Sequence, residues 1–135
     1  MTNIIICGFK AHASEVFDRI FENKAFNIIA VFSDETDKFC LLDKISISEK
    51  ANASDIDVFP SDDFSVETLG IINSKFGSID AILLVEWKKI LPESLYHFPK
   101  LGTYNIHDSL LPAYRGSSPL NWAIINGENS TGVSF

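Results

Sequence analysis

The sequence is short of the features that mark disulfide-rich, zinc-binding, secreted and membrane-spanning proteins. Its two cysteines, Cys7 and Cys40, lack the C-x-x-C spacing of a zinc site, and two do not make a disulfide framework. No apolar stretch approaches the roughly 18 residues of a membrane span. The first residues also lack the basic and apolar regions of a signal peptide. We therefore expect a cytoplasmic protein with no metal site and no membrane partner.

Basic residues are also scarce. The chain has 11 Lys and Arg against 18 Asp and Glu, which gives a formal net charge of −7 and a pI of about 4.8. An acidic chain repels the phosphate backbone of a nucleic acid unless it carries a local basic patch. The densest basic pair, Lys88-Lys89, is too small for such a patch. These features disfavour a nucleic acid as the partner.

Apolar residues, by contrast, are plentiful. The 135 residues are 46% hydrophobic and 12% aromatic, which suits one folded domain with its own core. Strand patterns, mostly continuous apolar runs, occur at residues 3–7, 27–32, 81–85 and 102–106, and a further strand begins at 132–135. Helical patterns occur at residues 14–23, 65–76, 92–98 and 119–126.

The alternation of these patterns predicts an α/β fold in a single domain over residues 1–135. We expect a Rossmann-like, open, mostly parallel sheet with helices on both faces. Ser14 and Ser65 are suited to cap the first two helices. Residues 34–57 are irregular, and we expect a surface excursion there, followed by a short strand at residues 57–60. In such sheets, ligands bind beyond the carboxyl ends of the strands.

The turn after the first strand does not carry a dinucleotide-binding pattern. A G-x-G-x-x-G motif needs several glycines so that the backbone can approach a pyrophosphate, and only Gly8 fits. Asp34 follows the second strand, where an acid can bind a ribose, but an Asp at this place is ordinarily a turn residue. We therefore do not expect a site for NAD.

Asn105 and His107 stand at positions i and i+2 on a strand end, so their side chains are expected on one face, whereas Asp108 is expected to point away. A neutral imidazole can take up a proton near physiological pH, and an Asn amide can donate to a developing oxyanion. Together they suit attack of an amine on a carbonyl group. An isolated pair of this kind also serves simply to cap a strand and its loop.

A longer pattern surrounds this pair. Asn105-x-His107-x-Ser-Leu-Leu-Pro continues as Ala-Tyr-Arg-Gly-x-x-Pro119, and it strongly resembles the signature of the formyltransferases that use 10-formyltetrahydrofolate. Residues 85–92, VEWKKILP, resemble the aromatic-x-x-Ile-Leu-Pro segment of that family. The resemblance continues through residues 122–133 and so covers at least residues 81–135.

The resemblance implies a role for each matching residue. Asn105 and His107 would be two of three catalytic residues: His107 would move a proton and polarise the formyl group, and Asn105 would hold the formyl oxygen. Trp87, Ile90 and Leu91 would border the pterin pocket of the folate. The loop near the catalytic pair would be shaped by Ser109, Leu110, Pro112, Tyr114, Arg115 and Gly116, with Arg115 holding it through hydrogen bonds or contacting the substrate.

Two departures from the family pattern stand out. The third catalytic residue of the family is an Asp that follows the strand beginning at residues 132–135, and no Asp of this sequence occupies that position. On this ground we expect a catalytic domain that is incomplete at its C-terminal end. The second departure is the first turn, Phe9–Ala13, which lacks the glycine often found there in the family.

The acceptor of the formyl group is expected to be the primary amine of a nucleotide-linked amino sugar. Residues 119–128, PLNWAIINGE, resemble the sugar formyltransferases more than the tRNA-directed branch, and the acidic charge also disfavours tRNA. A methionyl-tRNA formyltransferase is the first alternative and a glycinamide ribonucleotide formyltransferase the second. A non-catalytic remnant that only binds folate or a nucleotide is the third, and a homo-oligomer is compatible with all of them.

Overall fold

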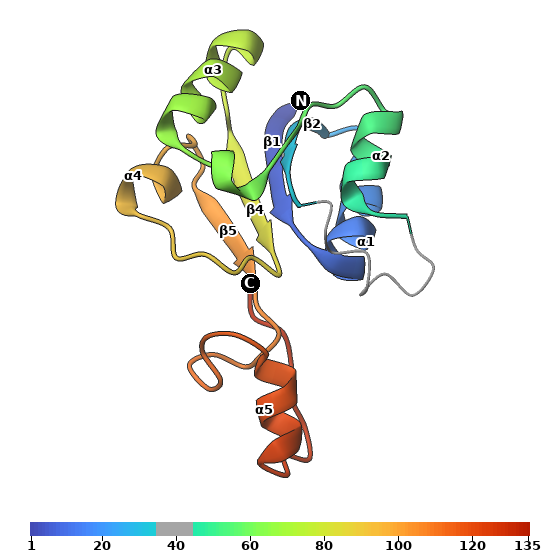
Figure 1. Ribbon diagram of the computed structural model, residues 1–135, viewed down its shortest axis with the longest axis vertical. Coiled ribbons are helices and arrows are strands. Elements are labelled where there is room, and N and C mark those ends of the chain that lie inside the picture. Colours follow the sequence, from blue (N-terminus) through green and yellow to red (C-terminus); the bar gives the residue numbers. More distant parts are fainter. Residues whose placement is uncertain (35–44) are drawn as a thin grey trace.

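The computed structural model describes residues 1–34 and 45–135 and contains a five-stranded sheet (Figure 1). The strands are β1 (Thr2–Gly8), β2 (Phe26–Phe32), β3 (Val58–Phe59), β4 (Ala81–Val85) and β5 (Thr103–Ile106). The helices are α1 (Lys10–Phe21), α2 (Ile47–Ala53), α3 (Val66–Phe76), α4 (Glu93–Tyr96) and α5 (Pro119–Ile125), with a 3-10 turn, η2 (Ser61–Asp63). None of the helices in these residues has the length and apolarity to cross a membrane.

The strand order is β3-β2-β1-β4-β5, and every neighbouring pair is parallel. The side chains of alternate residues in the central strand β1 point to opposite faces of the sheet. Ile5 and Cys7 join one core cluster with α3 and α4, and Ile4 and Ile6 join a second cluster with α1 and α2. Figure 1 shows these two pairs of helices on opposite sides of the sheet. The predicted α/β fold, with its parallel sheet covered on both faces, is confirmed.

Helix α1 begins four residues earlier than predicted, directly after the turn at Gly8. The residue before the helix, Phe9, makes no side-chain capping bond. Ser14 is therefore not a cap but a buried residue inside α1, where its hydroxyl donates to the carbonyl of Ile45 (2.7 Å). The prediction for α3 is confirmed, because the Ser65 hydroxyl accepts a hydrogen bond from the amide of Thr68 in the first turn of that helix (3.2 Å).

The expected irregular excursion at residues 34–57 is wrong for its second half. Residues 47–53 form α2, which begins with a capping box: the Ser46 hydroxyl accepts from the Glu49 amide, and the Glu49 carboxylate accepts from the Ser46 amide. The polar composition of this segment does not indicate a helix, yet α2 buries Ile47 and Ala51 against α1. The apolar patch noted at residues 39–42, like Cys40, lies outside the described residues.

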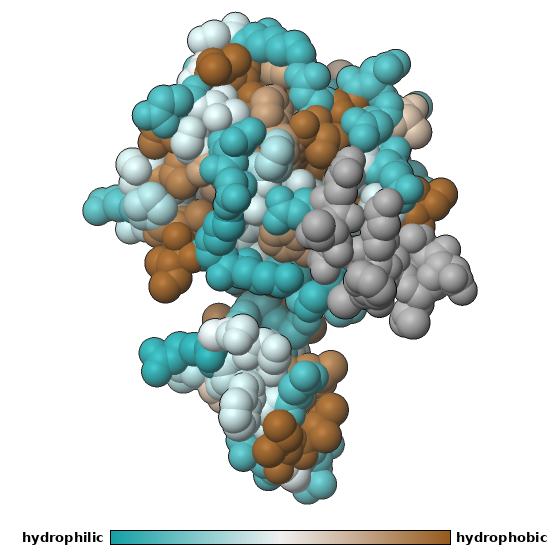
Figure 2. All heavy atoms as spheres, in the orientation of Figure 1, coloured by the Kyte–Doolittle hydropathy of each residue, from teal (hydrophilic) through white to brown (hydrophobic). Residues whose placement is uncertain are grey.

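The segment after β5 leaves the body of the sheet and carries α5 away from it (Figure 1). Side chains of α5 with a strongly hydrophobic character lie at the surface of this projection (Figure 2), and Trp122, Ile124 and Ile125 are exposed. The strand predicted to begin at residues 132–135 is reduced to one antiparallel bridge between Ser134 and His107.

Gly8 is the point where β1 turns into α1, and it has no space for a side chain. A Cβ atom there would lie 2.7 Å from Cβ of Ala13 and 3.0 Å from the carbonyl oxygen of Val85. We expect Gly8→Ala to lower the free energy of unfolding by about 1–3 kcal/mol, measured by urea denaturation. The matched control is Gly70→Ala inside α3, where a Cβ meets nothing within 4 Å. Equal stability of Gly8→Ala and the parent chain would contradict the close packing at this turn.

Candidate active site

Three neighbouring strands end in register at the carboxyl edge of the sheet. Gly8 of β1 pairs with Val85 of β4, and Val85 pairs with Ile106 of β5. The segments that follow these strands therefore meet, and a cavity of about 480 Å³ lies between them. This volume is in the range of small-molecule sites. Its lining includes Lys10, Glu86, Trp87, Lys88, Lys89, Ile90, Asn105, His107, Asp108, Gly116 and Ser118.

The cavity brings together the two residues predicted to be catalytic. The side-chain amide of Asn105 has no hydrogen-bond partner within residues 1–34 and 45–135, so its two N–H donors are available to a ligand. Nε2 of His107 lies 3.0 Å from the carbonyl oxygen of Tyr114. Because a carbonyl oxygen only accepts, this bond assigns the proton to Nε2 and leaves Nδ1 with a free lone pair. In the neutral ring, Nδ1 is therefore the nitrogen that can accept a proton from a ligand.

The loop after His107 is held by Ser134. The backbones of His107 and Ser134 exchange two hydrogen bonds, of 2.9 and 2.8 Å. The Ser134 hydroxyl donates to the carbonyl of Ser109 (2.7 Å) and accepts from the amide of Leu111 (3.0 Å). These four bonds clamp the start of the loop beside the strand end that carries His107.

Other bonds fix the rest of this loop. The buried hydroxyl of Ser109 donates to the carbonyl of Ala113 (2.8 Å), and the Tyr114 hydroxyl donates to the Glu128 carboxylate (2.6 Å). The loop-holding role expected of Arg115 is not seen, since in the described parts of the chain its guanidinium makes no hydrogen bond and the residue is exposed. The Ser109 bond holds this part of the loop, and the substrate contact expected of Arg115 as the alternative stays a prediction.

The remaining loop residues act through shape. Leu110 packs so closely on Gly132 that a Cβ atom at Gly132 would lie 2.5 Å from a Leu110 methyl carbon. Pro112 follows a cis peptide bond from Leu111. Gly116 has a φ of 100°, a backbone conformation that strongly favours glycine, and it lines the cavity.

Trp87 anchors the segment predicted to border the pterin pocket. Its ring stacks on Phe9 with 5.3 Å between centroids, and in the described structure its buried Nε1 has no hydrogen-bond partner. Ile90 is 98% exposed at the edge of the main cavity. Leu91 instead lines a second cavity of about 260 Å³, which Trp87 and Asn105 also line. The three residues therefore border two adjacent cavities that share Trp87.

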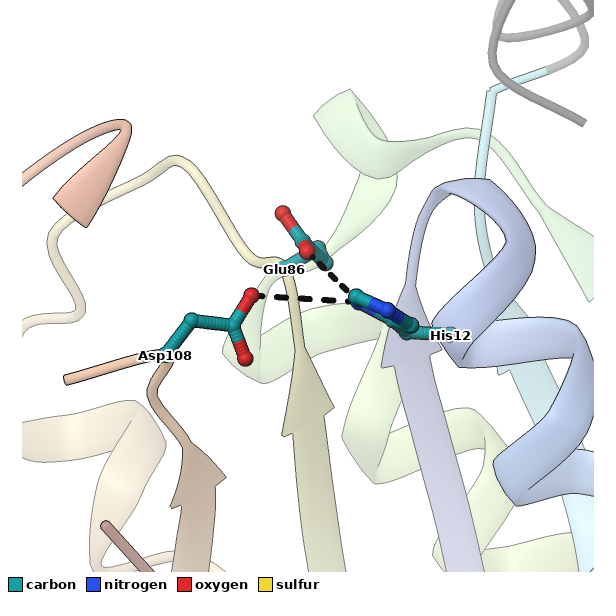
Figure 3. Close-up of side chains that lie close together, drawn as sticks. All are labelled: His12, Glu86 and Asp108. Atoms are coloured by element: carbon teal, nitrogen blue, oxygen red, sulfur yellow. Dashed lines mark hydrogen bonds and ion pairs between the residues drawn. The ribbon is translucent and has the colours of Figure 1, made fainter. Parts of the chain in front are cut away.

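A group of residues that was not predicted, His12, Glu86 and Asp108, lies close together (Figure 3), and two of them, Glu86 and Asp108, line the main cavity. Nδ1 of His12 lies 2.9 Å from Glu86 Oε1 and 3.8 Å from Asp108 Oδ2, and Lys10 binds the other oxygen of Glu86 (2.9 Å). The expectation that Asp108 points away from the site is wrong, because β5 ends at Ile106 and strand alternation does not extend to Asp108. No sequence motif could reveal contacts between positions so distant.

This group shifts two carboxyl pKa values in opposite directions. Burial acts to raise the pKa of Glu86, but hydrogen bonds to Lys10 and His12 outweigh it, and the pKa is lowered. Burial is the main cause that raises the pKa of Asp108, and the neighbouring Glu86 carboxylate raises it further. Asp108 is therefore the first of the two to take up a proton as the pH falls.

Loss of the Ser134 hydroxyl is expected to loosen the loop without unfolding the sheet. Ser134→Ala leaves the Leu111 amide and the Ser109 carbonyl without this partner. Each lost bond is worth about 1 kcal/mol. We expect faster hydrogen exchange at the Leu111 amide and little change in the strands, measured by NMR or mass spectrometry. The control is Ser130→Ala, an exposed serine of the same segment. Unchanged exchange at Leu111 would refute the clamp.

Asp108→Asn is expected to stabilise the chain at neutral pH. A carboxyl whose pKa is raised by folding binds its proton more tightly in the folded state, so its contribution to stability falls as the pH rises through the folded pKa. The amide removes this penalty and the repulsion from Glu86. We expect a gain of less than about 1 kcal/mol at pH 7 and none at pH 3, from urea denaturation at both values. A loss of stability at pH 7 would contradict the shift.

Known proteins resemble this chain in sequence and in fold. The profile of the family described as formyl transferase matches residues 2–135. A methionyl-tRNA formyltransferase of Fusobacterium nucleatum is 35% identical over 135 residues, which are 98% of this chain and 43% of that protein. The bifunctional polymyxin resistance protein ArnA of Wigglesworthia glossinidia brevipalpis is 56% identical over 56 residues, 42% of this chain and 9% of that protein.

Solved structures share the fold. The crystal structure of phosphoribosylglycinamide formyltransferase from Bacillus halodurans superposes with a TM-score of 0.74 at 19% identity, over 98% of this chain and 69% of that chain. This chain spans less than half the length of the curated relatives that it matches. The family profile covers nearly the whole sequence, and the chain belongs to the formyl transferase family.

Proposed function

We propose that the protein transfers a formyl group from 10-formyltetrahydrofolate to a primary amine in this cavity, with Asn105 and His107 as catalytic residues. The observation that carries the proposal is their position: both line one cavity, together with Trp87 and Ile90, in a chain of the formyl transferase family. The family relation supports an amine acceptor and a folate donor.

The cavities suit the donor in size and chemistry. A flat pterin ring needs an apolar wall and nearby backbone groups, and the segment from Trp87 to Leu91 offers both between the two cavities of about 480 and 260 Å³. Lysines and carboxylates both line the larger cavity. Lys10 is paired with Glu86 and Lys89 with Asp62, which leaves Lys88 as the lysine best placed to attract an anionic group of the ligand. In the proposal the donor's pterin lies against residues 87–91, and its formyl group lies near Asn105.

Each residue of the pair has one task. The Asn105 amide donates to the formyl oxygen, whose negative charge grows as the amine attacks, so the bond is strongest in the transition state. Nδ1 of His107 takes up the proton that the attacking nitrogen loses, because Nε2 is bound to the Tyr114 carbonyl. The bond between the formyl carbon and N10 of the folate then breaks, and the proton held by His107 passes to N10, so that tetrahydrofolate leaves. The Tyr114 bond keeps the His107 ring in place while the ring takes up the proton and gives it away.

Methionyl-tRNA is the acceptor that the relatives support best. The Fusobacterium protein and a second methionyl-tRNA formyltransferase, from a Nostoc species and 28% identical, both match 97% or more of the chain. Residues 119–128 and the net charge, by contrast, favour an amino sugar. The charge argument is weak at the site itself, because basic and acidic side chains both line the cavity and the net charge of the chain does not describe it.

An amino sugar linked to a nucleotide remains the second candidate. Residues 119–128 carry the pattern that resembles sugar formyltransferases. Three of these residues, Pro119, Leu120 and Asn121, line the main cavity or a neighbouring one. A nucleotide also supplies phosphates for Lys88, which makes no ion pair within the described residues. Both candidates share the same chemistry and differ in what holds the acceptor.

The test offers both acceptors to the 135-residue chain with 10-formyltetrahydrofolate. We expect isothermal titration calorimetry to detect binding of the donor. We also expect methionyl-tRNA to be formylated, which is measured as the amount of formylated product. Asn105→Ala and His107→Ala should each slow transfer about a hundredfold or more while donor affinity changes little. Asn129→Ala and His97→Ala, which replace exposed residues of the same types, serve as controls.

Each outcome has a defined meaning. Absence of donor binding would overturn the proposal, and unchanged transfer in both variants would remove the pair from the mechanism. Formylation of the amino sugar alone would select the second candidate. Donor binding without transfer to either acceptor would contradict the proposed transfer and leave only the donor site.

A further inference from the structure

His12, Glu86 and Asp108 form a ligand set that the proposed formyl transfer does not use (Figure 3). His12 belongs to α1, Glu86 directly follows β4, and Asp108 lies in the loop after β5. One imidazole nitrogen and two carboxylate oxygens, one from each residue, all lie within 4.8 Å of one another. The set arises because three strands end in register, and no spacing in the sequence announces it.

The separations of these atoms fit coordination of a small cation. Two ligands that are each about 2.0–2.1 Å from a zinc ion, at a tetrahedral angle, lie about 3.4 Å apart. The distances from His12 Nδ1 to the carboxylates of Glu86 and Asp108 are 2.9 and 3.8 Å, on either side of that value. The His12 side chain is 61% exposed, so small rotations can reach the required geometry.

Lys10 prepares the set rather than blocking it. Its ammonium group binds Glu86 Oε2 at 2.9 Å and leaves Oε1 facing His12. A hydrogen-bond partner of this kind fixes the orientation of a coordinating carboxylate. Coordination through Nδ1 also requires that the His12 proton be carried on Nε2, and a neutral imidazole can bind a metal through either nitrogen.

The ligand types select the class of ion. Magnesium and calcium prefer oxygen ligands alone, whereas an imidazole with carboxylates suits zinc and its neighbours. We propose that His12, Glu86 and Asp108 bind a divalent transition-metal ion of the zinc type at the rim of the Asn105–His107 cavity. Three protein ligands leave a coordination position for water or a substrate atom. The site stands independently of the proposed formyl transfer.

The test titrates tag-free protein with zinc chloride by isothermal titration calorimetry. All proteins carry Cys40→Ser, so that this thiol cannot contribute. We expect one saturable site and a rise in the melting temperature with zinc. Removing the hydrogen-bond partner of a metal ligand typically lowers metal affinity about 10- to 100-fold. His12→Ala and Asp108→Asn each remove a ligand itself, so each should weaken zinc binding by at least that much. Magnesium chloride at the same concentrations should give no comparable rise.

His97→Ala provides the matched control. His97 is 68% exposed and lies 3.8 Å from Glu93, so it is a surface histidine beside one carboxylate. Its replacement should leave zinc binding unchanged. Asp108→Asn keeps the shape of the side chain and decides the result if His12→Ala fails to fold. Absence of a saturable site, or equal affinity in Asp108→Asn and the parent chain, would overturn the proposal.

Discussion

The common register of β1, β4 and β5 is the constraint on which the site depends. Parallel pairing aligns Gly8, Val85 and Ile106 across the sheet, so all three strands deliver their next residues to one edge. Parallel strands require crossovers, and these return each strand start to the opposite edge. Residues distant in sequence therefore meet at the carboxyl edge, while the core beneath it is filled by apolar side chains on both faces.

The backbone at this edge stores strain that the rest of the fold supports. Lys10, Glu86 and Ser118 line the cavity with φ values of 62°, 56° and 55°, in the left-handed region. Tyr114, whose carbonyl binds His107, has a φ of 53°. Conformations of this kind cost about 1–3 kcal/mol each and gather at functional sites. The Lys10–Glu86 ion pair joins two of these residues directly.

Much of this arrangement could be predicted from the sequence because it rests on local patterns. Continuous apolar runs indicate strands buried on two faces, and β1 follows that rule closely. The loop signature between Asn105 and Gly116 is long enough to identify the family, which the profile match bears out. The cap at Ser65 was predictable because its bond reaches only three residues along the chain. Each of these signals lies within a few residues of what it specifies.

The features that could not be predicted depend on contacts between distant residues. Ser14 is of a residue type that commonly caps helices. The chain turns tightly at Gly8, however, so α1 begins at Lys10 and Ser14 is buried inside the helix. Asp108 follows a strand, yet alternation ends with the strand, and its surroundings are set by Glu86 and His12. Since Glu86 and Asp108 line both the main cavity and an apolar neighbour of about 410 Å³, a ligand in either lies beside the same two carboxylates. The charge of Glu86 and Asp108 therefore acts on ligands in both cavities. This shared position results from the fold and not from any sequence motif.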